Sequence, residues 1–389
     1  MMLYLDNNAT TRPAPEVVDS MRACLEADWG NPSSSHRSGI AARRRIDLAR
    51  GSASELLGCA PRELIFTSGG TEAANLAILG AWNHLRATGS PRTLLACAGT
   101  EHPAVLDSIR RGGDAGGEVV ELPVDHDGVL DLDFLDQLLE QRGDELAICS
   151  VMWANNETGV IQPIEEIAGR CRARGVLFHT DAVQWVGREP LSFSETSIDL
   201  LSCSGHKFHG PKGAGALVVR DGVQLRPAQL GGPQERERRG GTENVAAIAG
   251  FGVACELART WLQGDGRRQG LQLKESFERR MLELHEGAVV NGGGAPRLWN
   301  TTNLALPGLQ AQALVVVLSE RGLAVSGGAA CASGSIEVSG VLGAMGVEPE
   351  RAAGSLRISL SRGTTHAELD QAVEVFEAVL SLIRRQGTG

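Results

Sequence analysis

The chain has 389 residues and a formal net charge of −10 at pH 7, from 37 Lys and Arg against 47 Asp and Glu. That length exceeds one ordinary hydrophobic core, so we expect two domains. The acidic balance disfavours a protein that binds nucleic acid directly, because such binding relies on neutralising phosphate charge. No stretch approaches a membrane-spanning length, and the N-terminus carries no visible secretory signal. We therefore expect a cytoplasmic protein that binds no membrane.

The eight cysteines are scattered along the chain, and no two of them form a C-x-x-C pair. In a chain expected to be cytoplasmic, this spacing argues against a disulfide framework and against a cysteine zinc site. We therefore expect no metal site, and we expect most cysteines to be buried as small apolar side chains.

Strand-like and helix-like segments alternate between about residues 63 and 219, which predicts an α/β domain. Several of the strand candidates are continuous apolar runs, as a parallel sheet covered on both faces requires. The helix expected at Pro163–Arg174 has Pro163 in its first turn and Gly175 at a left-handed exit. The predicted strands are Glu63–Thr67, Thr93–Ala98, Glu118–Pro123, Leu146–Trp153, Val176–His179, Leu200–Ser202 and Gly215–Val219.

The pattern changes after Thr242, where long helical segments are followed by short strands and a closing amphipathic helix. We predict a large α/β domain over residues 15–260 and a small α+β domain formed by residues 1–14 and 261–389. The elements expected in this last third are helices over 243–263 and 267–285, strands at Leu304–Leu306 and Leu356–Leu360, and a helix at His366–Arg385.

Lys207 follows a strand and precedes a Gly/Pro-rich loop, so its amine is expected at the carboxyl edge of the sheet, where ligands of open α/β sheets bind. A lysine there can bond covalently to a carbonyl cofactor, although a surface lysine on a loop gives the same pattern. Asp181 ends the preceding apolar strand. Its carboxylate can keep a pyridine nitrogen protonated, or it can cap the next turn.

Two further segments are expected at the same edge. In Thr67-Ser68-Gly69-Gly70-Thr71-Glu72, a strand, a glycine turn and a helix start suit a phosphate, and a plain capped helix would look similar. His102 precedes Pro103, which starts a helix after another strand. Its imidazole can stack on a cofactor ring or carry protons, or it can be an ordinary polar residue at a helix start.

Taken together, these segments resemble the cysteine desulfurase family of pyridoxal-phosphate enzymes, which have fold type I with a mostly parallel central sheet. The resemblance runs through most of the chain. Its other landmarks are Leu5-Asp6-Asn7-Asn8-Ala9-Thr10-Thr11, Asn31-Pro32-Ser33-Ser34-Ser35-His36, Asn155-Asn156-Glu157-Thr158-Gly159, His179-Thr180-Asp181-Ala182-Val183-Gln184, Ser204-Gly205-His206-Lys207 and Arg239-Gly240-Gly241-Thr242-Glu243-Asn244.

The resemblance implies pyridoxal 5′-phosphate as cofactor and a role for each matching residue. Lys207 would carry the cofactor, Asp181 would pair with its ring nitrogen, Gln184 would bind its ring hydroxyl and His102 would stack on it. Gly70, Thr71, Ser204 and His206 would bind its phosphate. Arg357 would anchor the substrate carboxylate, with Asn156 assisting it and contacting the cofactor. The family forms homodimers, in which Thr242 would reach the cofactor phosphate of the partner subunit.

Cys331 lies among small residues, Ser326-Gly327-Gly328-Ala329-Ala330-Cys331-Ala332-Ser333-Gly334-Ser335, which leave little to pack and predict a mobile segment. An inert cysteine in a tight turn is the plainer interpretation. By resemblance, Cys331 takes the sulfur of L-cysteine as a persulfide, as in the long-loop subgroup of the family, and passes it to an acceptor protein. Such a transferase would release L-alanine.

Two departures from the family leave alternatives open. The run Ser335-Ile336-Glu337-Val338-Ser339 lacks a proline that many relatives have, and the chain ends soon after its last helix, without the longer tail of iron–sulfur members. Iron–sulfur cluster biosynthesis, nucleic-acid thiolation and other sulfur pathways therefore remain possible destinations. Selenocysteine or cystine lyase activity is the nearest alternative. Others are an aminotransferase and a non-catalytic subunit of a sulfur-transfer complex, although Lys207, Asp181 and Cys331 are all present.

Overall fold

The computed structural model describes residues 2–327 and 339–387. Within these residues the largest sheet has seven strands in the order β2-β8-β7-β6-β5-β3-β4, and β8 runs antiparallel to both of its neighbours. The other neighbouring pairs are parallel. The strands are β2 (Leu64–Thr67), β3 (Leu94–Ala98), β4 (Glu118–Leu122), β5 (Leu146–Ser150), β6 (Leu177–Asp181), β7 (Leu200–Ser204) and β8 (Gly215–Val219).

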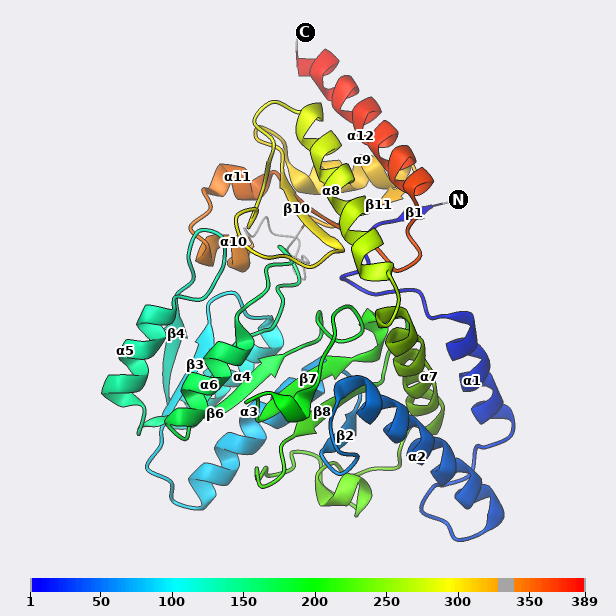
Figure 1. Ribbon diagram of the computed structural model, residues 1–389, viewed down its shortest axis with the longest axis vertical. Helices are drawn as coiled ribbons and strands as arrows, with labels where there is room; N and C mark the ends of the chain where they lie inside the picture. The colour runs from blue at the N-terminus through cyan, green and yellow to red at the C-terminus, as the bar shows by residue number, and fades with distance from the viewer. Residues whose placement is uncertain (1, 328–338, 388–389) are drawn as a thin grey trace.

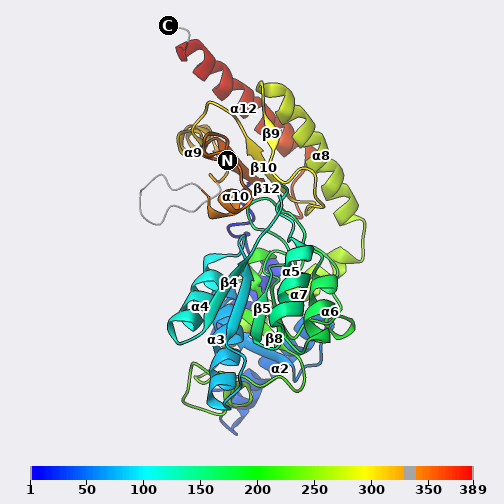
Figure 2. The ribbon, with the colours of Figure 1, turned by 90° about the vertical axis from the view of Figure 1, so that its left-hand side faces the viewer.

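Helices cover both faces of this sheet (Figure 2). Alternate strand residues point to opposite faces, so Leu64 and Phe66 join one hydrophobic cluster and Ile65 joins another. The first face packs against α2 (Arg37–Leu57), α5 (Leu132–Arg142), α6 (Ile164–Ala173) and α7 (Val245–Leu262), with α1 (Pro15–Glu26) against α7. The second packs against α3 (Gly70–Ala87) and α4 (Pro103–Asp114).

The C-terminal third gathers with the first residues of the chain around a separate hydrophobic cluster (Figure 1). Its antiparallel sheet has the order β12-β10-β9, and β1 pairs in parallel with β11 beside it. Its strands are β1 (Leu3–Tyr4), β9 (Val289–Val290), β10 (Thr301–Ala305), β11 (Leu323–Ala324) and β12 (Ser355–Ser359). Its helices are α8 (Gly266–Leu284), α9 (Ala311–Glu320), α10 (Gly340–Ala344), α11 (Pro349–Ala353) and α12 (His366–Gly387).

The α/β architecture with a mostly parallel sheet is confirmed, and the predicted strands and helices exist within a few residues of their expected bounds. The strand predicted at Leu146–Trp153 ends at Ser150 in the structure, so the predicted range is three residues too long. Beyond Ser150 the chain still bonds to β6 on one side, but Met152 donates its N–H to the Glu101 carboxylate instead of to a strand. Pro163 is the N-cap of α6 and not in its first turn, while Gly175 has the expected positive φ of 63°. The division into domains stays a prediction.

Of the described helices, α7 alone has the length and apolar composition of a membrane span, which the sequence analysis did not anticipate. It packs against α1 and α2, and ten of its residues are buried. Its apolar composition is therefore accounted for by the protein core. The seven cysteines in the described part of the chain are free, and six of them are buried, as expected.

Candidate active site

A cavity of about 600 Å³ opens at the carboxyl edge of the large sheet. The ends of β3, β6 and β7 reach it from one side, and β12 and α10 reach it from the other. It collects ten of the twelve residues predicted to form the site. These are Gly70, Thr71, His102, Asn156, Asp181, Gln184, Ser204, His206, Lys207 and Arg357.

Lys207 ends a 3₁₀ turn, Gly205–Lys207, directly after β7. Its Nζ donates to the carbonyl oxygens of Asn8, at 2.6 Å, and of Ala9, at 2.8 Å. Burial, helped by the charges of Arg188 and Arg357, lowers the pKa of Lys207 to about 8. A lysine with that pKa is partly neutral near physiological pH, so its amine can act as a nucleophile or a base.

Asp181 is the last residue of β6 and is 7 % exposed. Its Oδ1 accepts the backbone N–H of Val183 at 2.9 Å. Burial raises the pKa of Asp181, and the neighbouring charges of His102 and Lys207 oppose that rise. A buried carboxyl on the cavity wall with a basic neighbour can pair with a protonated ring nitrogen.

His102 is the N-cap of α4, where its Nδ1 accepts the N–H of Ala104 at 3.1 Å. A neutral imidazole that accepts at Nδ1 carries its proton on Nε2. Burial lowers the pKa of His102, with Asp181 acting in the opposite direction. The ring is therefore predominantly neutral near pH 7, which suits stacking, and Nδ1 can take up a further proton only when it releases the Ala104 N–H.

The predicted phosphate cradle lies where α3 begins. A β-carbon on Gly70 would come within 2.6 Å of Val183 Cγ2, so this position has no room for a side chain. The first N–H groups of the 18-residue helix α3 have no intrahelical partners, and its dipole favours an anion there. His206, whose Nδ1 lies 3.1 Å from Thr10 Oγ1, belongs to the same wall. The cradle fits a phosphate group.

Arg357 enters the cavity from β12 and is 6 % exposed. Its Nη2 donates to Asp6 Oδ1 at 2.7 Å, and its Nη1 donates to the Asn156 carbonyl at 3.2 Å. Its Nε is buried with no hydrogen-bond partner among the described residues. A buried guanidinium with a free donor can bind a carboxylate. Asn156 contributes its backbone carbonyl to this arrangement.

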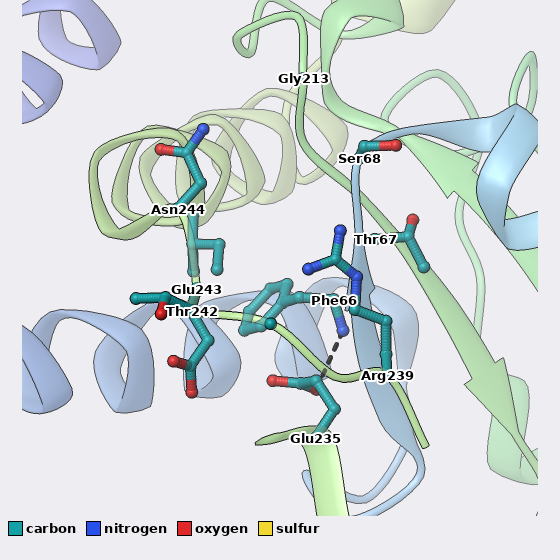
Figure 3. A pocket seen from close by; sticks show the side chains of 11 residues that line it. Phe66, Thr67, Ser68, Gly213, Glu235, Arg239, Thr242, Glu243 and Asn244 are labelled. Atoms are coloured by element: carbon teal, nitrogen blue, oxygen red, sulfur yellow. Dashed lines mark hydrogen bonds between the residues drawn. The ribbon is translucent and has the colours of Figure 1, made fainter. Parts of the chain in front are cut away.

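Two predicted residues are not in this cavity. Thr242 lines a second cavity of about 160 Å³, together with Thr67, Ser68 and Arg239 (Figure 3). In that cavity, the Glu235 carboxylate accepts the Phe66 N–H at 3.0 Å. Cys331, and with it the prediction of a mobile segment, lies outside the described residues.

The structure adds residues to which the sequence analysis gave no role. Asn8 lies between the two halves of the site, because its carbonyl accepts from Lys207 and its Nδ2 donates to the Asn156 carbonyl at 3.1 Å. Glu101, 3 % exposed, also lines the cavity, and its Oε2 has no described partner. Asn8 belongs to a landmark of the resemblance, and Glu101 directly precedes His102, so each lay beside an available signal. Arg188 has no such signal in the sequence.

These side chains fit pyridoxal phosphate. A lysine with a lowered pKa, a buried carboxyl at a strand end, a neutral histidine and an anion cradle without room for a β-carbon line one cavity. No group of three His, Cys, Asp or Glu side chains in residues 2–327 and 339–387 could hold a metal ion.

Comparison with known proteins identifies the family. The aminotransferase class-V model matches residues 3–372. The cysteine desulfurase NifS of Azotobacter vinelandii is 42% identical over 383 residues, which cover 98% of this chain and 93% of that protein. A solved NifS-like protein superposes with a TM-score of 0.90 at 34% identity, covering 98% of this chain and all of that one.

A second solved structure, SspA in complex with cysteine, has a TM-score of 0.80 at 31% identity and covers 93% of this chain and 99% of its own. Together with the fold and the lysine-containing cavity, these similarities confirm the resemblance found in the sequence. The chain belongs to the cysteine desulfurase family of pyridoxal-phosphate-dependent enzymes, within the class-V aminotransferases.

Proposed function

We propose that this cysteine desulfurase converts L-cysteine to L-alanine and holds the removed sulfur as a persulfide on Cys331. The observation that carries the proposal is the cavity shared by Lys207, Asp181 and Arg357. These residues supply an amine for a carbonyl cofactor, a carboxylate for a pyridine nitrogen and a guanidinium for a substrate carboxylate. The relative SspA, solved with cysteine, supports cysteine as the substrate.

Pyridoxal 5′-phosphate is the proposed cofactor, and Lys207 is the residue that would bond to it. The ring would be held by Asp181 at its nitrogen, by Gln184 at its hydroxyl and by His102 on its face, with Asn156 as a further contact. The phosphate would be held by Gly70, Thr71, Ser204 and His206. When bound, pyridoxal phosphate supplies a ring that stores the electron pair left when a bond at the substrate α-carbon breaks.

Arg357 orients the substrate through its carboxylate. Its Nη2 is already engaged by Asp6, so the guanidinium is fixed in place before substrate arrives. Its Nε remains available. Two charge-assisted hydrogen bonds to a carboxylate, each worth roughly 1.5–3 kcal/mol, would hold the α-carbon near Lys207.

Lys207 and His102 handle the protons. Because its pKa is about 8, the Lys207 amine is poised to take the proton from the substrate α-carbon and to return it elsewhere on the substrate. His102 is neutral and takes the proton of a thiol at Nδ1, in exchange for its hydrogen bond from the Ala104 N–H, which converts Cys331 to the thiolate nucleophile.

The sulfur step exchanges one bond for another. The Cys331 sulfur attacks the substrate sulfur, so an S–S bond forms while the bond between the substrate β-carbon and its sulfur breaks. The electron pair of the broken bond stays with the carbon skeleton, which takes up a proton at that carbon and leaves as alanine. The sulfur is oxidised and the carbon reduced, so no external oxidant or reductant is needed.

We further propose a cytoplasmic homodimer that passes sulfur to an acceptor protein. Thr242 would contact the cofactor phosphate in the partner subunit. Its position outside the main cavity of its own chain supports this role, because a residue that served its own cofactor would be expected in that cavity. The acceptor could belong to iron–sulfur cluster assembly or to another sulfur pathway.

The test is peptide mass spectrometry after incubation with L-cysteine. We expect an added sulfur atom on Cys331 and an equal amount of alanine. Cys331→Ser should keep the cofactor absorbance and lose alanine formation, while the control Cys59→Ser, at a partly exposed cysteine, should behave like the wild type. Normal turnover by Cys331→Ser would contradict the assignment and favour a selenocysteine or cystine lyase.

A further inference from the structure

Arg188 is a buried cation that the proposed mechanism does not use. It lies in the turn after β6 and is 4 % exposed. Its guanidinium donates to the Gln184 carbonyl at 2.8 Å, to Gln184 Oε1 and to the Asn7 carbonyl at 3.4 Å. Among the described residues no carboxylate lies within ion-pair distance of it. Burying an uncompensated charge is costly, so this position calls for a reason other than stability.

Arg188 fixes which end of the Gln184 amide faces the site. A guanidinium can only donate hydrogen bonds, so it must be met by the amide oxygen. The NH₂ end of Gln184 then points the other way, where Nε2 donates to the Asn8 carbonyl at 3.1 Å. Gln184 therefore presents a donor to this part of the cavity, as a ring hydroxyl oxygen would require.

The same hydrogen bonds lead to Lys207. The Asn8 carbonyl that accepts from Gln184 also accepts from Lys207 Nζ at 2.6 Å, and Arg188 holds the preceding residue through the Asn7 carbonyl. The fixed positive charge of Arg188 also acts on the amine. After burial, it is the largest contributor to the lowered pKa of Lys207, ahead of Arg357.

We propose that Arg188 is a positioning residue for the catalytic lysine: it orients Gln184 and the Asn7–Asn8 backbone around Lys207 and adds a positive charge to the surroundings of the Lys207 amine. This inference deepens the proposed function and rests on Lys207 carrying the cofactor. It assigns Arg188 no contact with substrate.

The test is a pH titration of the visible absorbance of the holoenzyme, which reports the proton on the Lys207 nitrogen bonded to the cofactor. Arg188→Met removes the charge, and Arg188→Lys keeps it. Arg362→Met is a matched control, because Arg362 is a half-buried arginine whose pKa burial lowers to about 10, and it is not among the main contributors to the lowered pKa of Lys207. The thermal unfolding midpoint of each variant checks that the fold is intact.

We expect Arg188→Met to raise the titration midpoint by about one pH unit, a tenfold change in proton affinity, and Arg188→Lys and Arg362→Met to stay near the wild type. A midpoint in Arg188→Met within a few tenths of a unit of the wild type would overturn the inference. So would an equal shift in Arg188→Lys or Arg362→Met. If borohydride fixes no cofactor to Lys207 in the wild type, the proposed function fails instead, so the two failures are distinguishable.

Discussion

Replacing Lys207 by methionine in the cofactor-free protein is expected to stabilise the fold at neutral pH. Methionine has a similar length and no charge, so the change removes mainly the cost of burying an ammonium group. In the unfolded chain the pKa of a lysine is about 10.5, whereas burial lowers the pKa of Lys207 in the folded protein to about 8. The folded state therefore binds the proton more weakly than the unfolded state.

The size of the effect follows from this difference in pKa. At pH 7 the buried lysine lowers the free energy of unfolding of the wild type by about 3 kcal/mol. This is the pKa difference of about 2.5 multiplied by 1.36 kcal/mol per pKa unit, and nearly all of it applies because pH 7 lies below both pKa values. Between pH 8 and pH 10.5 the unfolded state binds more protons than the folded state, so wild-type stability rises with pH and the cost falls. At pH 9.5 about 1.4 kcal/mol of the cost of burying the protonated lysine remains.

Urea unfolding of cofactor-free wild type and Lys207→Met at pH 7 and pH 9.5 measures the effect. The stability advantage of the variant should shrink by about 2 kcal/mol over this range, while any packing change contributes equally at both pH values. Lys274→Met is a matched control outside the site. Lys274 is 4 % exposed, and burial also lowers its pKa to about 8. An equal advantage of Lys207→Met at both pH values would refute the reasoning.

Two further predictions concern substrate binding and packing. Arg357→Met loses two charge-assisted hydrogen bonds to the substrate carboxylate, so kcat/KM for L-cysteine should fall by a factor of roughly 10²–10⁴. Arg357→Lys should recover only part of this loss. A loss below threefold in steady-state kinetics would exclude Arg357 as the anchor. Gly252→Ala would place a β-carbon 2.6 Å from Ala49 Cα and force α7 away from α2, lowering the free energy of unfolding by about 1–3 kcal/mol. Gly169→Ala, which meets nothing within 4 Å, is the control, and equal stability of the two variants in urea would contradict the packing argument.

Much of the fold could be predicted from local sequence patterns. The strand at Gly215–Val219 has the predicted bounds, because an apolar run between turn residues marks both of its ends. Its antiparallel direction could not be predicted, since an apolar run carries no direction. The end of β5 was missed for a similar reason. Residues 151–153 are apolar, and the strand ends where Met152 bonds to the carboxylate of Glu101, 51 residues away along the chain.

The site could be predicted where a residue type has few chemical uses in its context. Lys207 and Asp181 follow strands whose carboxyl ends meet at one sheet edge, so their proximity follows from topology. Arg188 could not be found, because a single arginine in a loop is usually a solvated charge. Its role depends on burial against Gln184 and Asn7, which only the folded chain creates.

Borohydride reduction followed by peptide mapping tests the central claim most directly. We predict that the reduced protein carries one pyridoxyl group, located on the peptide that contains Lys207, and that Lys207→Ala carries none while the Lys274→Met control is labelled like the wild type. Labelling of a different lysine, or undiminished labelling of Lys207→Ala, would contradict the placement of the cofactor in this cavity.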